Sequence, residues 1–242
     1  FGLRDFNIAY LGQYGACSTM AQGLLMTAVF VESNAANTAA CVTSSHFASA
    51  ERQYRFPLEY GGVRTPTAQW TVTGSGCCIV SNAKKGACIA RATAGKIVDL
   101  GVTDANNMGA AMAPAAAQTF IDYFNDTNTK PSDYDAVFTG DLGLVGSRSL
   151  YDLLSLENID LEPKHYDCGM MIFDLEGQDV HAGGSGCGCA GSVFCSKILN
   201  SVNSGKYNNI LFMATGALMS PTSAGQGESI PSVAHLLNIK LR

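Results

Sequence analysis

The sequence contains few charged residues, and its basic residues are not clustered. Charged side chains make up 14% of the chain, with 15 Lys and Arg against 20 Asp and Glu, for a formal net charge of −5. A protein that binds nucleic acid needs a basic patch to neutralise phosphates. We therefore expect no nucleic acid among its partners.

Neither a membrane-spanning segment nor a secretory leader is recognisable in the sequence. The longest apolar run, residues 24–31, is far shorter than the ~20 residues that cross a bilayer. The first residues, Phe1-Gly-Leu-Arg-Asp, lack both an apolar stretch and a starting methionine. These features predict a fragment of an intracellular protein, without a transmembrane segment.

Metal-binding cysteine patterns are also absent. Nine cysteines and four histidines are present, but no two cysteines have C-x-x-C spacing. The pairs Cys77/Cys78 and Cys187/Cys189 are spaced wrongly for a zinc knuckle, so we predict no metal site. The odd number of cysteines and their place in apolar runs favour a reducing compartment over a disulfide framework.

Apolar and small residues are plentiful: 47% of the chain is hydrophobic, and 26 residues are glycine. This composition supports a sizeable core, in one large domain or two of ordinary size. The segments predict an α/β fold, with helices near residues 20–31, 103–124 and 146–154 and strands near residues 38–43, 69–80, 87–98, 136–139, 209–214 and 233–241. The turn at residues 81–86 predicts that the two strands around it form an antiparallel pair.

One cysteine lies where a loop becomes a helix, in Tyr14-Gly15-Ala16-Cys17-Ser18. A thiol at a helix N-terminus lies near unpaired backbone N–H groups and the positive end of the helix dipole, which favours the thiolate. Gly15 and Ala16 leave room for a ligand to approach. Cys17 is therefore a candidate reactive or ligand-contacting thiol, and the alternative is a small buried residue that packs the helix start.

Three further polar residues lie where α/β proteins hold their ligands. His46 follows the strand at residues 38–43, and Asp141 follows the strand at residues 136–139. His181 precedes a run of small residues that opens a helix, where the backbone can approach a ligand closely. The alternatives are a surface hydrogen bond for His46 and a cap on the next helix for Asp141.

Four motifs together resemble the thiolase superfamily, in which a cysteine at a helix start, an Asn-Glu-Ala-Phe turn, a His-Pro-x-Gly turn and a Cys-x-Gly-x-Gly loop meet in one pocket. Their counterparts here are Gly-Ala-Cys17-Ser, Phe-Thr-Gly-Asp141-Leu-Gly, His181-Ala-Gly-Gly-Ser-Gly and Thr215-Gly216. Within this superfamily the chain is similar, from end to end, to the stage V sporulation protein AD family. That similarity is carried by residues 44–47, 50–55, 69–76, 103–114, 178–189 and 214–223.

The resemblance implies a thiolase-like αβαβα sandwich of two similar halves, each with a mixed five-stranded sheet. We expect the N-terminal half at residues 1–130, truncated because its first strands are missing from this sequence, and the C-terminal half at residues 131–242. Thiolase-like folds commonly pair through a strand of the first half, so a homodimer is a further expectation.

The resemblance also implies a function in sporulation and spore germination. Members of the family bind dipicolinic acid (pyridine-2,6-dicarboxylate) and are implicated in its transport into the developing forespore. They act at the inner spore membrane with membrane-embedded proteins of the same operon. The implied ligand-binding residues are Cys17, Ser18, His46, Asp141, His181, Gly184, Thr215 and Gly216. No cofactor is implied, although Ca²⁺ accompanying dipicolinate would offset the charge of Asp141.

Two positions argue against thiolase catalysis. Ala214 stands where the superfamily has its second catalytic cysteine, and Asp141 stands where it has a neutral Asn, which puts negative charge where an oxyanion develops. We therefore predict a non-catalytic binding protein on an enzyme scaffold. The alternatives are a thiolase-like or ketoacyl-synthase-like acyltransferase with Cys17 as nucleophile, and a purely structural subunit of a membrane complex.

Overall fold

The computed structural model describes residues 4–48 and 63–242. Its α-helices are α1 (Thr19–Glu32), α2 (Met108–Thr127), α3 (Gly143–Ser155), α4 (Cys168–Met171), α5 (Cys187–Val193), α6 (Leu199–Asn203) and α7 (Pro221–Gly225). Short 3₁₀ turns are η1 (Arg4–Phe6), η4 (Pro131–Asp133) and η5 (Glu162–Lys164), and a π-helix, η6 (Phe194–Ile198), joins α5 to α6. The strands are β1 (Thr38–Ser45), β2 (Trp70–Thr71), β3 (Gly74–Ser81), β4 (Ala87–Thr93), β5 (Ala136–Thr139), β6 (His165–Asp167), β7 (Gly184–Ser185), β8 (Asn209–Ala217) and β9 (Ser232–Leu241).

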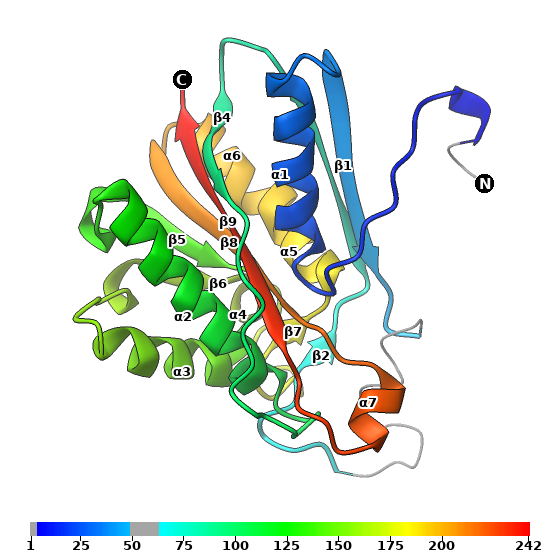
Figure 1. The fold of residues 1–242 in the computed structure, drawn as a ribbon, viewed down its shortest axis with the longest axis vertical. Coiled ribbons are helices and arrows are strands. Elements are labelled where there is room, and N and C mark those ends of the chain that lie inside the picture. Colours follow the sequence, from blue (N-terminus) through cyan, green and yellow to red (C-terminus); the bar gives the residue numbers. More distant parts are fainter. Residues whose placement is uncertain (1–3, 49–62) are drawn as a thin grey trace.

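These elements form stacked layers (Figure 1). Helices α2 and α3 cover one face of a five-stranded sheet, and α1 and α5 pack between its other face and the two-stranded sheet of β1 and β3. The α/β class predicted from the sequence is confirmed, as are the helices expected near residues 20–31, 103–124 and 146–154. Residues 50–55, one of the segments that carry the resemblance, lie outside the described part of the chain.

The five-stranded sheet has the order β4-β9-β8-β5-β6. β5 is parallel to β6 and β8, whereas β9 is antiparallel to both of its neighbours. The central strand β8 is apolar on both faces, as expected for a strand covered by helices on each side. Its residues Ile210, Phe212 and Ala214 face the core shared with α1 and α5, and Leu211 and Met213 face the core shared with α2 and α3.

The prediction that the two strands around residues 81–86 form an antiparallel pair with each other is wrong. β3 pairs with β1, where Cys41 lies opposite Cys78, and β4 pairs with β9 in the other sheet. The turn therefore carries the chain from one layer to another. A turn motif shows only that the chain changes direction, whereas the partner of a strand is set by burial against residues distant in sequence.

The division expected between residues 130 and 131 does not separate the two sheets. β4 and α2 both precede residue 130, yet β4 is hydrogen-bonded to β9 and α2 packs on β8 and β9. Phe120 of α2 lies in the same apolar cluster as Leu211 and Leu236. The elements that build the five-stranded sheet therefore begin at Ala87.

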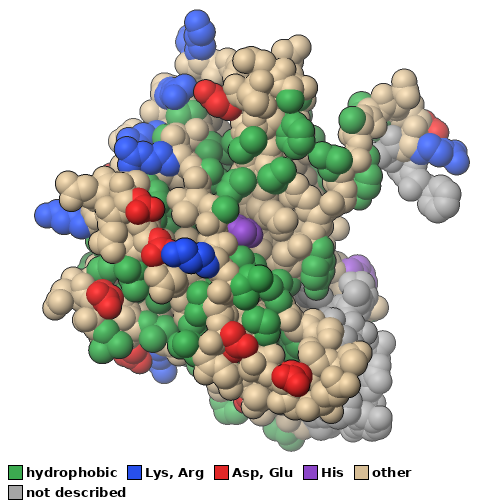
Figure 2. All heavy atoms as spheres, viewed as in Figure 1, with side chains coloured by type: hydrophobic (Ala, Val, Ile, Leu, Met, Phe, Trp, Pro, Cys, Tyr) green, Lys and Arg blue, Asp and Glu red, His purple; other side chains and the backbone are tan. Residues whose placement is uncertain are grey.

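The strand β1, expected to be buried, is buried on one face only. Cys41 and Thr43 point into the protein, whereas Val42 is 59% exposed and Ile79 of β3 is 74% exposed. Apolar side chains such as Val29 are also exposed on α1, and Figure 2 shows hydrophobic side chains on the surface over this helix. The outer face of the two-stranded sheet thus stays accessible in this chain.

Two glycines allow α2 and α3 to cross with their backbones in contact. A Cβ added at Gly146 would lie 2.8 Å from the Cα of Gly109, and a Cβ added at Gly109 would lie 2.7 Å from the backbone N of Gly146. Real Cβ atoms do not approach this closely, so any larger side chain forces the helices apart. This packing holds the start of α3, which follows β5, close to α2 on the face of the five-stranded sheet.

We expect Gly146→Ala to lower the free energy of unfolding by about 1–3 kcal/mol, because overpacking displaces α3 from α2. Urea unfolding followed by circular dichroism measures the effect. Gly225→Ala is the control, since a Cβ added there meets no atom within 4 Å. Equal unfolding midpoints for the two variants would contradict the close crossing.

Candidate functional site

Four segments that are distant in sequence meet beside the carboxyl end of β5. Asp141 follows β5, Thr215 lies in β8, Ser185 ends β7, and Cys17 lies in the turn before α1. The side chains of these four residues are joined by hydrogen bonds. Parallel strands of α/β proteins bind ligands at this edge, so this group of side chains is the candidate site.

The carboxylate of Asp141 lies at the centre of this group and is fully buried. Its Oδ2 accepts hydrogen bonds from the Ser185 hydroxyl at 2.8 Å and from the Gly186 N–H at 2.9 Å, and Thr215 Oγ1 lies 3.4 Å from Oδ1. Burial raises the pKa of Asp141 to about 6, against the opposing effect of hydrogen bonds from Gly186, Cys17 and Ser185. A small change in charge nearby can therefore protonate this carboxyl near neutral pH.

Cys17 is half-buried, and its Sγ lies 3.8 Å from the Ser185 hydroxyl oxygen. The Ser185 hydroxyl donates its own proton to Asp141. The Cys17 thiol also hydrogen-bonds Asp141 directly, so that thiol, hydroxyl and carboxylate lie side by side.

The turn that carries Cys17 is held by backbone contacts. Ser18 is fully buried, and its hydroxyl donates to the Gly15 carbonyl at 2.6 Å. Ala16 has a positive φ of 49°, a conformation that an L-residue rarely adopts. A Cβ added at Gly216 of β8 would collide with the Gly15 carbonyl, so only glycine lets the strand lie against the turn. Ser18 and Gly216 thus shape the turn that positions the thiol.

The two candidate histidines contact other parts of the chain. His181 Nδ1 donates to the Thr65 carbonyl at 2.6 Å, and its Nε2 lies 2.9 Å from a carboxylate oxygen of Asp179. Both partners are acceptors, so the ring makes both bonds only when each nitrogen carries a proton. His46 is exposed, and its Nδ1 accepts from the Ala48 N–H at 3.1 Å.

Arg64, a residue that the sequence did not single out, shares Asp179 with His181. Its Nη2 lies 2.7 Å from Asp179 Oδ2, and its guanidinium lies 4.6 Å from the centroid of the Trp70 ring. Trp70 also stacks on Phe47, with ring centroids 4.6 Å apart. Trp70 pairs with Gly184 across β2 and β7, next to the pair of Thr71 and Ser185.

Sequence reasoning also missed the side chains that hold the site together. Gln69 Nε2 donates to the backbone carbonyls of Asp141 at 2.7 Å and of Gly184 at 3.0 Å, which ties the end of β5 to β7. Gln69 lies in a segment that carries the family resemblance, and this was the available signal. Asp167 gave no signal, because a lone Asp before a cysteine is not a motif.

Asp167, not Asp141, caps the helix that follows β5. Its carboxylate oxygens accept from the Leu142 and Gly143 N–H groups, each at 2.9 Å, and from the Thr139 hydroxyl at 2.6 Å. These bonds satisfy the first amides of α3, as an N-terminal cap does. The alternative role predicted for Asp141 is therefore taken by a different residue, and Asp141 is left to contact Ser185 and Cys17.

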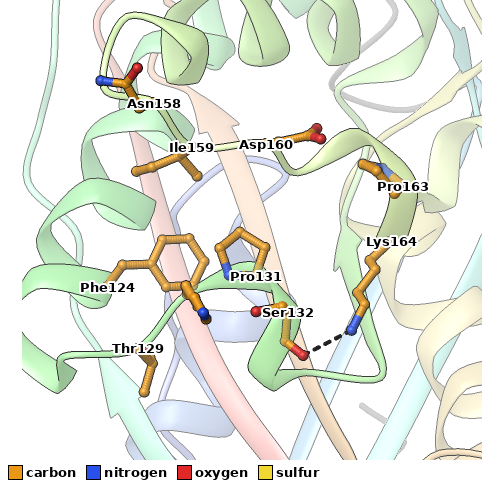
Figure 3. Close-up of a pocket in the computed structure, with 10 residues that line it drawn as sticks. Phe124, Thr129, Pro131, Ser132, Asn158, Ile159, Asp160, Pro163 and Lys164 are labelled. Carbon is orange, nitrogen blue, oxygen red and sulfur yellow. Dashed lines mark hydrogen bonds between the residues drawn. The ribbon is translucent and has the colours of Figure 1, made fainter.

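A cavity of about 390 Å³ lies at the other end of β5 (Figure 3). Its lining is Phe124, Thr129, Lys130, Pro131, Ser132, Asn158, Ile159, Asp160, Pro163 and Lys164. The Lys164 ammonium donates to the Ser132 carbonyl at 3.0 Å and also to the Tyr134 carbonyl. These two bonds engage the ammonium group of Lys164. The cavity lies at the start of β5, whereas Asp141 follows the end of this strand, so the cavity is separate from the candidate site.

Within residues 4–48 and 63–242, no three His, Cys, Asp or Glu side chains are grouped so that they could hold a metal ion. In the same part of the chain, no helix has the length and apolar character needed to cross a membrane.

Comparison with known proteins identifies relatives of the whole chain. The model of the family stage V sporulation protein AD (SpoVAD) matches residues 1–240. Stage V sporulation protein AD of Bacillus subtilis (strain 168) is 45% identical over 232 residues, which cover 96% of this chain and 68% of that protein.

Solved structures with the same fold include two enzymes of low sequence identity to this chain. The 3-oxoacyl-[acyl-carrier-protein] synthase III from Aquifex aeolicus VF5 has a TM-score of 0.56 at 12% identity, over 99% of this chain and 69% of the enzyme. AbyA1, a tetronic acid condensing enzyme, has a TM-score of 0.59 at 14% identity, over 94% of this chain and 67% of that one. The thiolase-like fold implied by the resemblance is confirmed.

Asp141 makes the stability of the protein depend on pH. Its pKa is raised from 3.8 to about 6 in the folded state, so its stabilising contribution is fully present below pH ~4 and is lost as the pH rises through 6. Asn does not titrate. We expect the free energy of unfolding of Asp141→Asn, relative to wild type, to rise by about 3 kcal/mol between pH ~4 and ~7.

Urea unfolding across this pH range measures that difference. Asp152→Asn, on the exposed side of α3, is the control, and its difference from wild type should stay nearly constant. A flat difference for Asp141→Asn as well would show that the carboxyl titrates normally.

Proposed function

This chain belongs to the stage V sporulation protein AD family, and on this premise we propose that it binds dipicolinic acid for uptake into the developing spore. The protein acts at the inner spore membrane, together with membrane-embedded proteins of the same operon. It uses a condensing-enzyme scaffold to hold a small molecule without reacting with it. The observation that carries this proposal is the joined group of Cys17, Ser185, Asp141 and Thr215 at the ligand-binding edge of the sheet.

A dianionic ligand requires positive charge, and Arg64 is the cationic group that we assign to it. Arg guanidinium groups bind carboxylates with two parallel hydrogen bonds. The Nη2 of Arg64 is bonded to Asp179, whereas its Nη1 is buried and has no hydrogen-bond partner among the described residues. A ligand carboxylate would satisfy this nitrogen. The stack of the Arg64 guanidinium on the Trp70 ring holds the guanidinium in place before a ligand binds.

The negative charge of Asp141 is compatible with an anionic ligand because its pKa is raised to about 6 by burial. An arriving dianion disfavours a second negative charge, which promotes protonation of the carboxyl. Protonated Asp141 can then donate a hydrogen bond. Ca²⁺ that accompanies dipicolinate is the alternative means of offsetting the charge.

Two residues support a binding role over catalysis. Ala214 in β8 cannot replace the second catalytic cysteine of thiolases, since it has no titratable group. Asp141 offers an oxyanion no neutral donor in its ionised form. The competing function is acyl transfer, and the half-buried Cys17 thiol at the start of α1 is the observation that favours it.

Isothermal titration of the full-length protein with sodium dipicolinate tests the binding proposal. We expect saturable binding that Arg64→Gln weakens about tenfold or more, because a charge-assisted hydrogen bond is lost. Cys17→Phe should also abolish binding by filling the site. Lys84→Gln, which removes one exposed positive charge, is the matched control and should bind as wild type. An intact protein that shows no saturable heat, with or without Ca²⁺, overturns the proposal.

Incubation with an acyl-CoA, followed by intact-mass measurement, separates the two functions. We expect the mass of the protein to stay unchanged, because the negative charge of Asp141 beside Cys17 disfavours the thiolate that would attack the thioester. An acyl group that appears on wild type, and is missing from Cys17→Ser, would establish acyl transfer instead.

A further inference from the structure

A second group of thiols lies where β3 packs against η6. Cys78 of β3 and Cys195 of η6 are 117 positions apart in sequence, yet their Sγ atoms are 3.4 Å apart. Cys78 is buried, and Cys195 is partly exposed to solvent. Two thiols in van der Waals contact need to close by only about 1.4 Å to reach the S–S bond length of about 2.05 Å.

Close packing holds these two elements in register. A Cβ added at Gly76 of β3 would collide with the carbonyl of Gly191 in α5, so the helix backbone lies directly on the strand. The hydroxyl of the next residue, Ser192, donates to the Ser75 carbonyl at 3.3 Å. The contact between the two sulfurs is thus the continuation of a row of contacts along the same helix.

We propose that Cys78 and Cys195 are a redox-active pair that forms an intramolecular disulfide when the protein meets a peroxide. The bond fixes η6 to β3. This inference is independent of the function proposed above, because it involves neither Cys17 nor a dipicolinate site.

Cys195 is the thiol that reacts first. The hydrogen bond from the Cys78 thiol lowers the pKa of Cys195 to about 7, which leaves a large fraction of thiolate at neutral pH. The pKa of Cys78 is raised by that same hydrogen bond and by burial. Cys41, which lies opposite Cys78 across β1 and β3, is a competing thiol, but burial raises its pKa to about 12, and its Sγ lies 3.7 Å from the Met20 carbonyl oxygen.

The reaction consumes one peroxide for each disulfide. The Cys195 thiolate attacks one peroxide oxygen, so that an S–O bond forms, the O–O bond breaks and hydroxide leaves and is protonated to water. Cys78 then attacks the sulfur of the resulting sulfenic acid, so that the S–S bond forms, the S–O bond breaks and a second water leaves with the thiol proton. Each sulfur gives up one electron to the peroxide. A dithiol reductant reverses the bond.

The cross-link bears on the candidate site through the helix. α5 begins at Cys187, directly after Gly186, whose N–H donates to Asp141. α5 continues without a break into η6 and Cys195. A disulfide at Cys195 therefore anchors the far end of the helix that holds the Asp141 carboxylate. A π-helix at this point is notable, since such turns are frequent at functional sites.

Peptide mapping of the protein after treatment with hydrogen peroxide tests the proposal. Free thiols are blocked with N-ethylmaleimide before digestion. We expect one linked pair of peptides, containing Cys78 and Cys195, lighter by two hydrogens than the reduced pair and released by dithiothreitol. Cys88→Ser, which removes a half-buried thiol of β4, is the control and should form the same link.

Two variants separate the roles of the pair. Cys195→Ser should form no link, and Cys78→Ser should leave Cys195 as a sulfenic acid that dimedone traps. The melting temperature of oxidised wild type should rise by about 5 °C or more over the reduced protein, because a long loop is closed, and Cys195→Ser should show no such rise. A link from Cys195 to Cys41 or Cys77, a link between two molecules, or two unreacted thiols would overturn the proposal.

Discussion

The buried carboxylate of Asp141 joins the end of β5 to two other strands and to a turn. A carboxylate taken out of water without partners is strongly destabilising, so the chain must supply donors to it. Ser185, Gly186 and Thr215 do so, and each comes from a segment more than forty residues away in sequence. The position of β7 and of the start of α5 is consequently fixed relative to β5 and β8. The turn that carries Cys17 is packed against β8 at this same point.

A second buried carboxylate makes this arrangement possible. Asp167 takes the hydrogen bonds of Thr139 and of the first amides of α3, so that Asp141 does not have to cap the helix. Burial raises the pKa of Asp167, and the negative charge of Asp167 contributes to the raised pKa of Asp141. One carboxylate thus holds the backbone in position, and the other is left with a protonation state that responds to its surroundings.

Local patterns in the sequence predicted the helices and the position of Asp141, but not the partners of the strands. The alanine-rich run predicts α2, and Asn107 caps its start in the structure; both effects act within a few residues. The pairing of β4 with β9 depends on contacts across about 150 positions, which no local pattern encodes. Local motifs likewise identified Cys17 and Asp141. The roles of Gln69 and Arg64 depend on contacts with residues distant in sequence, so only the structure shows them.

The chain of Cys17, Ser185 and Asp141 bears directly on whether this scaffold reacts or only binds. In an acyl-transfer enzyme the thiol must give up its proton, and an adjacent base or cation stabilises the thiolate. Here the thiol lies beside a hydroxyl that donates to the Asp141 carboxylate, and the thiol also hydrogen-bonds that carboxylate itself. A thiolate would place a second negative charge next to this carboxylate in a buried setting. The arrangement therefore favours a protonated Cys17 as long as Asp141 is ionised. On the function proposed here, the site presents a ligand with hydrogen-bond donors instead of a nucleophile, as a binding protein built on an enzyme fold requires.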